Sequence, residues 1–131
     1  MDIQEAPEDK PILTCGEVHL KGWGHETWIH NDSLYCGKLL FIKKDAIMSY
    51  HYHKDKTETF YLYSGKVVAI LGTEDNEFFR VPTHIFRMEP GDVLELPSMT
   101  PHSIIALEDS LIMEVSTKHN EEDSFRIVKG D

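Results

Sequence analysis

Short runs in which apolar and polar residues alternate occupy most of this chain of 131 residues. The clearest runs cover residues 34–44, 59–63 and 111–117, and turn-forming residues such as Ser64-Gly65 separate them. Alternation with a period of two is typical of a β-strand that buries one face. A sustained helical period of 3.6 residues is not visible, so the pattern predicts an all-β chain.

Around ten short strands follow from this pattern, each bounded by turn residues. Many short strands with turns at short intervals predict an antiparallel barrel or jelly roll. No linker divides the chain, so we expect one domain at residues 12–131, after a mobile acidic arm at 1–11. We expect strands at residues 12–14, 17–20, 27–30, 34–44, 47–53, 59–63, 66–71, 78–82, 84–88, 93–96, 103–107 and 111–117, then a polar loop at 118–123.

One stretch combines this strand pattern with metal-binding residue types. His51 and His53 are two residues apart, so on a strand they project from the same face. Polar residues 54–57 suit a bend, after which Glu58 opens a second apolar run that stops at Gly65. Two antiparallel strands joined in this way bring Glu58 back beside the histidines. Two imidazoles and a carboxylate suit a divalent transition metal such as Fe, Mn, Ni, Co or Zn.

His102 offers a fourth ligand at the start of another apolar run. A turn at residues 89–92 and a short strand at 93–96 place it on a neighbouring strand pair. A lone histidine at a strand end is usually only a satisfied polar residue. The candidate therefore depends on the more specific pattern of two histidines and a glutamate before it.

These residues resemble the two motifs of the cupin family, G-x5-H-x-H-x3-4-E-x6-G and G-x5-P-x-G-x2-H-x3-N. The matching positions are His51, His53, Glu58 and Gly65 in the first motif, and Gly91, Pro97 and His102 in the second. The chain departs from the motifs at turn or packing positions, namely Asp45, Met99 and Ala106. The resemblance implies a cupin jelly roll that holds one divalent transition metal ion (Zn, Mn, Fe, Ni or Co) through His51, His53, Glu58 and His102.

Strand parity indicates what surrounds the predicted metal. If the ligands face inward, the same face carries apolar residues, namely Phe60, Leu62, Ile104 and Ala106. Plain core filling explains the first three of these equally well. Tyr61 and Tyr63 have the opposite parity and are expected on the outer face, where they are compatible with a subunit contact. Glu114 lies in an apolar strand and is expected to serve a structural or hydrogen-bonding role.

A narrower resemblance concerns the ends of the domain. Residues 21–26, KGWGHE, resemble the [KR]-P-W-G-x-[EY] opening of mannose-6-phosphate isomerase-like cupins, and residues 111–117 and 122–127 resemble that group's closing strand and tail. This resemblance implies aldose–ketose isomerisation of a sugar or sugar phosphate, with the metal on the C1 and C2 oxygens. Glu58 is then the candidate base if it is only loosely bound to the metal; otherwise a neighbouring group must act. Lys21 and Arg126 are candidates for binding the substrate's phosphate or hydroxyl groups. Solvated surface cations are an equally good interpretation of Lys21 and Arg126.

Two other functions remain open, because the ligand set does not select one reaction. An Fe(II)-dependent dioxygenase or a metal-dependent lyase acting on a small acid would use the same ligands. A non-catalytic cupin that binds a sugar or metabolite is the third hypothesis.

Charge and composition narrow the range of partners. The formal net charge of −10 argues against nucleic acid, which requires a basic face. No apolar run is long enough to cross a bilayer, and the polar start is not a signal peptide, so we expect a cytoplasmic protein in which Cys15 and Cys36 are reduced. The expected partners are a small-molecule substrate and, as the family resemblance implies, a second copy in a homodimer.

Overall fold

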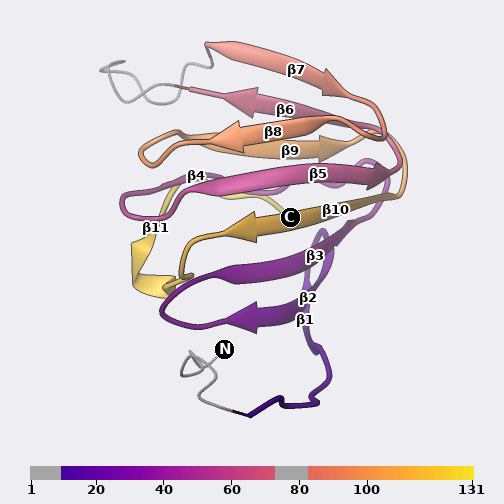
Figure 1. The fold of residues 1–131 in the computed structure, drawn as a ribbon. Coiled ribbons are helices and arrows are strands. Elements are labelled where there is room, and N and C mark those ends of the chain that lie inside the picture. Colours follow the sequence, from indigo (N-terminus) through magenta and orange to yellow (C-terminus); the bar gives the residue numbers. More distant parts are fainter. Residues whose placement is uncertain (1–9, 73–82) are drawn as a thin grey trace.

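Two antiparallel sheets form the domain in the computed structural model, which describes residues 10–72 and 83–131. The six-stranded sheet has the order β1 (Glu17–Lys21), β2 (Gly24–Asn31), β3 (Cys36–Ile42), β10 (Ser110–Ser116), β5 (Glu58–Ser64), β8 (Val93–Leu96). The five-stranded sheet has the order β11 (Ser124–Val128), β4 (Tyr50–His53), β9 (His102–Ala106), β6 (Val67–Leu71), β7 (His84–Met88). The 3-10 helix η1 (Glu121–Asp123) precedes β11, and Figure 1 shows β1 and β7 at opposite ends of the molecule. The prediction of an all-β jelly roll is confirmed.

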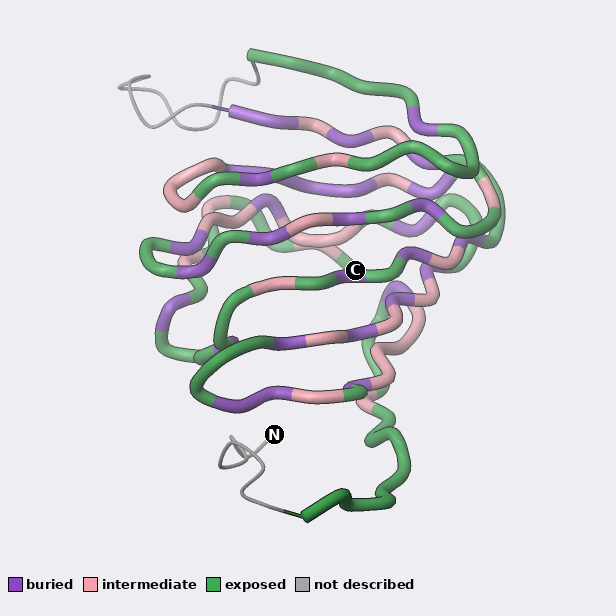
Figure 2. The backbone as a smooth tube through the Cα atoms, in the orientation of Figure 1, coloured by how far each residue is buried: buried purple, intermediate pink, exposed green. Residues whose placement is uncertain are grey.

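The core lies between the two sheets and follows the alternation in the sequence. Along β3, β5 and β10, buried residues alternate with more exposed ones, as the changing colours of the tube show (Figure 2). The residues predicted to face inward are at most 2% exposed, namely Phe60, Leu62, Ile104 and Ala106. Tyr61 and Tyr63 are exposed on the opposite face, also as predicted.

The predicted strand boundaries need several corrections. Residues 12–14 form no strand and are exposed, because a short apolar run gains a β conformation only when a neighbouring strand pairs with it. The predicted strand at 34–44 is limited to Cys36–Ile42, and of residues 47–49 only Ile47 makes an isolated bridge, to Ile105. The predicted loop at 118–123 contains η1. The strand predicted at 78–82 and most of the arm at 1–11 lie outside the described residues.

Left-handed backbone conformations occur at the positions where the chain departs from the cupin glycines. Asp45 has φ of 70° and Met99 has φ of 62°, while the retained glycines Gly65 and Gly91 have φ of 94° and 98°. A non-glycine residue in this region costs about 1 kcal/mol or more. Backbone hydrogen bonds hold both turns, since the Asp45 N–H donates to Ala106 O at 2.8 Å and the Met99 N–H to His53 O at 2.6 Å.

Candidate metal centre

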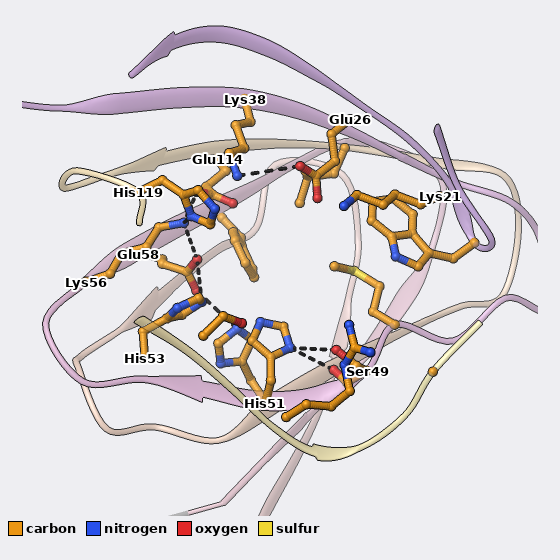
Figure 3. A pocket seen from close by; sticks show the side chains of 18 of the residues that line it. Lys21, Glu26, Lys38, Ser49, His51, His53, Lys56, Glu58, Glu114 and His119 are labelled. Carbon is orange, nitrogen blue, oxygen red and sulfur yellow. Dashed lines mark hydrogen bonds and ion pairs between the residues drawn. The ribbon is translucent and has the colours of Figure 1, made fainter. Parts of the chain in front are cut away.

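Three histidines meet on the inner face of the five-stranded sheet. His51 in β4 pairs directly with His102 in β9, and His53 lies two residues further along β4 on the same face. One ring nitrogen from each of the three lies within 4.8 Å of the others. Glu58 reaches this cluster from the start of β5 in the opposite sheet, so the site joins the two layers (Figure 3).

Backbone carbonyls fix the orientation of all three imidazoles. The Nδ1 atoms of His51, His53 and His102 lie 3.0 Å from Ser49 O, 3.0 Å from Asp123 O and 2.8 Å from Thr100 O, respectively. A carbonyl can only accept, so each Nδ1 carries a proton, and the Nε2 atoms of His51 and His53 keep their lone pairs for the shared centre. His102 Nε2 lies 3.1 Å from the Glu58 carboxylate, to which it can donate, and it must release that proton to bind a metal. Ligands of a bound metal are oriented in this way in proteins, and the three histidines therefore fit a divalent transition metal.

Glu58 adds a negative charge at the edge of the histidine cluster. Its Oε2 lies 3.1 Å from His102 Nε2, and its Oε1 lies 3.5 Å from His53 Nε2. Burial would raise the pKa of Glu58, but His102 and Lys56 outweigh burial and hold that pKa well below its usual range. The side chain is therefore a carboxylate, the form that can bind a cation.

The histidines differ in how they respond to this carboxylate. Burial, together with the neighbouring His102 and His53, lowers the pKa of His51 to about 3, and burial also lowers the pKa of His53. Burial opposes the charged form of His102 as well, but the adjacent Glu58 carboxylate outweighs it and raises the pKa of His102. His51 and His53 are consequently neutral at pH 7, as metal ligands must be.

The site extends beyond the histidines to a buried lysine, Lys56. Lys56 is 3% exposed, and its Nζ lies 3.0 Å from Glu58 Oε1, 2.8 Å from Glu114 Oε2 and 3.1 Å from His119 Nδ1. Burial alone would lower the pKa of Lys56, but Glu114 and Glu58 outweigh it and raise that pKa. The ammonium group is therefore charged, and because it can only donate, the Nδ1 of His119 must accept its hydrogen bond.

These groups line one pocket of about 200 Å³ between the sheets. A second ion pair stands in its wall, with Lys38 Nζ 3.5 Å from Glu26 Oε1 and 4.2 Å from the centre of the Trp28 ring. Lys21 and Arg126 also line the pocket, and both residues are exposed. The structure thus brings together His51, His53, Glu58, His102, Lys21 and Arg126, all six residues singled out from the sequence.

Several charged or titratable wall residues were not predicted from the sequence, among them Lys38, Glu26, Lys56 and His119. Lys38 shares the inward parity of Leu40 and Ile42 in β3, and a charge at a buried strand position is a signal that could have identified it. Glu26 in β2 lies opposite Leu40 and could have been identified in the same way. Lys56 and His119 lie in connecting segments, where no local pattern marks them. Glu114, expected to be structural or hydrogen-bonding, is 4% exposed and accepts hydrogen bonds from Lys56 and Ser116.

The fold of this chain is similar to the solved structures of several different proteins. KdgF from Halomonas sp. has a TM-score of 0.67 at 18% identity, covering 81% of this chain and 91% of that protein. Oxalate decarboxylase from Bacillus subtilis has a TM-score of 0.73 at 21% identity, covering 92% of this chain. The capsular polysaccharide assembling protein CapF from Staphylococcus aureus has a TM-score of 0.66 at 18% identity, covering 84% of this chain. At these identities the likeness concerns the fold alone.

Coverage differs among these proteins, since the chain spans 35% of the oxalate decarboxylase and 33% of CapF. No curated protein sequence matches the chain. No helix within the described residues is long and apolar enough to span a membrane.

The family model of the cupins matches residues 12–129. A match over nearly the whole length, together with the jelly-roll fold, shows that the chain belongs to the cupin family.

Proposed function

We propose that this cupin is a metal-dependent enzyme that isomerises a small anionic sugar, in an aldose–ketose reaction of a sugar phosphate. The observation that carries the proposal is the set of three imidazoles whose Nδ1 atoms are fixed by carbonyls, beside a carboxylate in a charged pocket. His51, His53, His102 and Glu58 would hold one Zn, Mn, Fe, Ni or Co ion. When bound, such an ion supplies Lewis-acid polarisation of the substrate's oxygen atoms.

The charge of the pocket supports an anionic substrate. Although the whole chain carries a formal charge of −10, the described residues that line the pocket include as many cations as carboxylates. These residues are Lys21, Lys38, Lys56, Arg126 and Lys129, and Glu26, Glu58, Glu114, Glu121 and Asp131. With neutral histidines the side chains of the lining have a net formal charge of zero, and one divalent ion would make it +2, which matches a dianionic phosphate monoester. The cavity lies below the ~300–1,000 Å³ typical of drug-sized ligands, which favours a small substrate.

Glu58, Lys21 and Arg126 have distinct roles in this proposal. The proton that moves between adjacent carbons needs a base, and Glu58 can accept it when the three histidines hold the metal and Glu58 binds that metal only loosely. Lys56 donates to Glu58 Oε1 at 3.0 Å and so holds that carboxylate in place within the pocket. Lys21 and Arg126 bind the phosphate of the substrate, because both are exposed cations on the lining of the same pocket.

A metal-dependent enzyme acting on a small organic acid is the second candidate. The same exposed cations, Lys21 and Arg126, suit a carboxylate as well as a phosphate. Decarboxylation, lyase chemistry or Fe(II)-dependent oxygenation would then replace isomerisation. A measurement of oxygen consumption distinguishes the oxygenation from the other two reactions.

The test is NMR of the protein reconstituted with each of the five metals and mixed with aldose and ketose phosphates in D2O. We expect interconversion, with deuterium entering at the carbon next to the carbonyl. Glu58→Gln should lower turnover by ~100-fold or more, the usual contribution of a general base. Arg126→Ala should raise KM, whereas Arg87→Ala, on edge strand β7 of the same sheet, is the matched control. Saturable binding without product, or product only from small acids, would overturn the isomerase proposal.

A further inference from the structure

Two side chains of opposite charge lie in the pocket wall across from the histidines. Glu26 in β2 and Lys38 in β3 line the pocket from the inner face of the six-stranded sheet, where Glu26 is paired with the buried Leu40. His51 lines the same pocket from the five-stranded sheet, and Figure 3 shows Glu26 and Lys38 on the far side of the cavity from it. The proposed isomerisation gives neither Glu26 nor Lys38 a role.

The ammonium group of Lys38 is buried but poorly paired. Lys38 is 3% exposed, and its ion-pair partner Glu26 Oε1 lies 3.5 Å from Nζ, beyond the ~2.7–2.9 Å of a charge-assisted hydrogen bond. Nζ also lies 4.2 Å from the centre of the Trp28 ring, a contact that stabilises the charge without a hydrogen bond. Within residues 10–72 and 83–131 no hydrogen bond to this Nζ is formed, so its N–H groups are available to a ligand.

Lys56, in the same pocket, is a buried lysine with complete pairing. It has the same exposure of 3%, but its Nζ has three partners at 2.8 to 3.1 Å, namely Glu58, Glu114 and His119. Burial of a charge without such partners costs free energy. Because the poorly paired ammonium group of Lys38 lies on the lining of a cavity, its geometry points to a ligand that completes the pairing.

Glu26 offers a hydrogen-bond acceptor beside this donor. Its Oε1 accepts a hydrogen bond from Trp28 Nε1 at 2.6 Å and faces Lys38, whereas no hydrogen bond between described residues reaches its Oε2. The side chain is 13% exposed and lines the pocket, so a ligand in the cavity can reach Oε2. Burial would raise the pKa of Glu26, but Lys38 and the Trp28 hydrogen bond outweigh burial and lower that pKa, so the group is a carboxylate.

We propose that Glu26 and Lys38 form a subsite for a hydroxyl group of the substrate, an inference that rests on the proposed function and narrows the substrate class to polyhydroxylated compounds. A hydroxyl group both donates and accepts, so one such group can donate to Glu26 Oε2 and accept from Lys38 Nζ. Glu26 would repel a phosphate or carboxylate, so the anionic end of the substrate binds at Lys21 and Arg126 instead. A small acid without hydroxyl groups would leave the subsite empty, which favours the sugar phosphate over that second candidate.

Isothermal titration calorimetry of the full chain, reconstituted with Mn2+, tests this subsite with two phosphate monoesters. A hexitol phosphate carries hydroxyl groups but no carbonyl group, so it cannot be isomerised, and butyl phosphate carries neither. We expect the wild type to bind the hexitol phosphate at least ~10-fold more tightly than butyl phosphate. Glu26→Gln and Lys38→Met should each lower this ratio of affinities by ~10-fold. The combined variant should lower the ratio by less than the product of the two effects, because both side chains bind one hydroxyl group.

Glu121→Gln is the matched control, because it removes a carboxylate, 67% exposed, from the lining of the same pocket and should leave the ratio as in the wild type. A change of pocket charge or shape alone would alter the affinity for both phosphates together. Equal affinity of the wild type for the two probes would overturn the subsite, as would an unchanged ratio in either folded variant, with folding checked by thermal unfolding. Selective binding of the hexitol phosphate without turnover in the NMR experiment would overturn the isomerase proposal and support the subsite.

Discussion

At the scale of single residues, Lys56 shows how strongly its surroundings determine the role of a charged side chain. In the sequence it belongs to a polar bend, yet its ammonium group is buried between Glu58, Glu114 and His119. The three partners come from β5, from β10 and from the segment before η1, so only tertiary contacts create this site. No pattern within the bend distinguishes Lys56 from the neighbouring Lys54, which is exposed.

His119 should make the stability of the metal-free protein depend on pH. Burial and the nearby Lys56 and Lys38 lower its pKa from 6.5 to about 4. Between these values the unfolded chain binds a proton that the folded chain does not, so stability falls as the pH falls from about 6.5 to about 4. In urea unfolding with chelator present, His119→Gln should reduce this slope by up to about 1.4 kcal/mol per pH unit.

His84→Gln, which removes an imidazole from the exposed edge strand β7, is the matched control. His51, whose pKa is lowered to about 3, adds to the slope in both proteins, so some pH dependence should persist in His119→Gln. An unchanged slope in His119→Gln would contradict the neutral, buried state of this side chain.

At the scale of elements, η1 and the connection between β4 and β5 form one unit. The Asp123 carboxylate accepts hydrogen bonds from the backbone N–H groups of Lys54 at 2.8 Å, Asp55 at 3.1 Å and Lys56 at 3.1 Å. The Asp123 carbonyl accepts from His53 Nδ1 at 3.0 Å. A residue about seventy positions away thus fixes both a candidate ligand and the bend that leads to Glu58.

Asp123→Ala should lower the free energy of unfolding by about 2–4 kcal/mol, because three N–H donors lose a charged acceptor. Urea unfolding provides the measurement. Glu122→Ala is the matched control, because it removes the exposed carboxylate next to Asp123 and leaves these hydrogen bonds in place. Equal stability of the two variants would show that the bend holds its shape without Asp123.

Element prediction from the sequence succeeded where the period of two is long and one face is buried. Phe60 and Tyr61 were assigned to opposite faces correctly because burial alternates along β5 from Glu58 to Tyr63. The contact between η1 and the bend could not be predicted, because it joins segments far apart in sequence. The strand at 12–14 was wrong for a related reason, since an apolar run alone does not supply a partner strand.

At the scale of the whole molecule, the two sheets supply different residues of the site. The five-stranded sheet supplies the histidines, and the six-stranded sheet supplies Glu58 and the wall residues Glu26, Lys38 and Glu114 on its inner face. The sequence motifs correctly predicted that the three histidines and Glu58 lie together, because the motif spacing places all four at one site. The charge balance of the pocket could not be predicted, because it depends on which strands become neighbours.

We propose above all that this chain holds a divalent transition metal at His51, His53 and His102. Mass spectrometry of metal content tests it most directly, comparing the wild type with His51→Ala/His53→Ala and with the control His25→Ala/His84→Ala, which changes two histidines outside the site. We expect about one metal ion per chain in the wild type and the control, and none in His51→Ala/His53→Ala. A wild type without metal after reconstitution, or equal metal content in all three proteins, would contradict it.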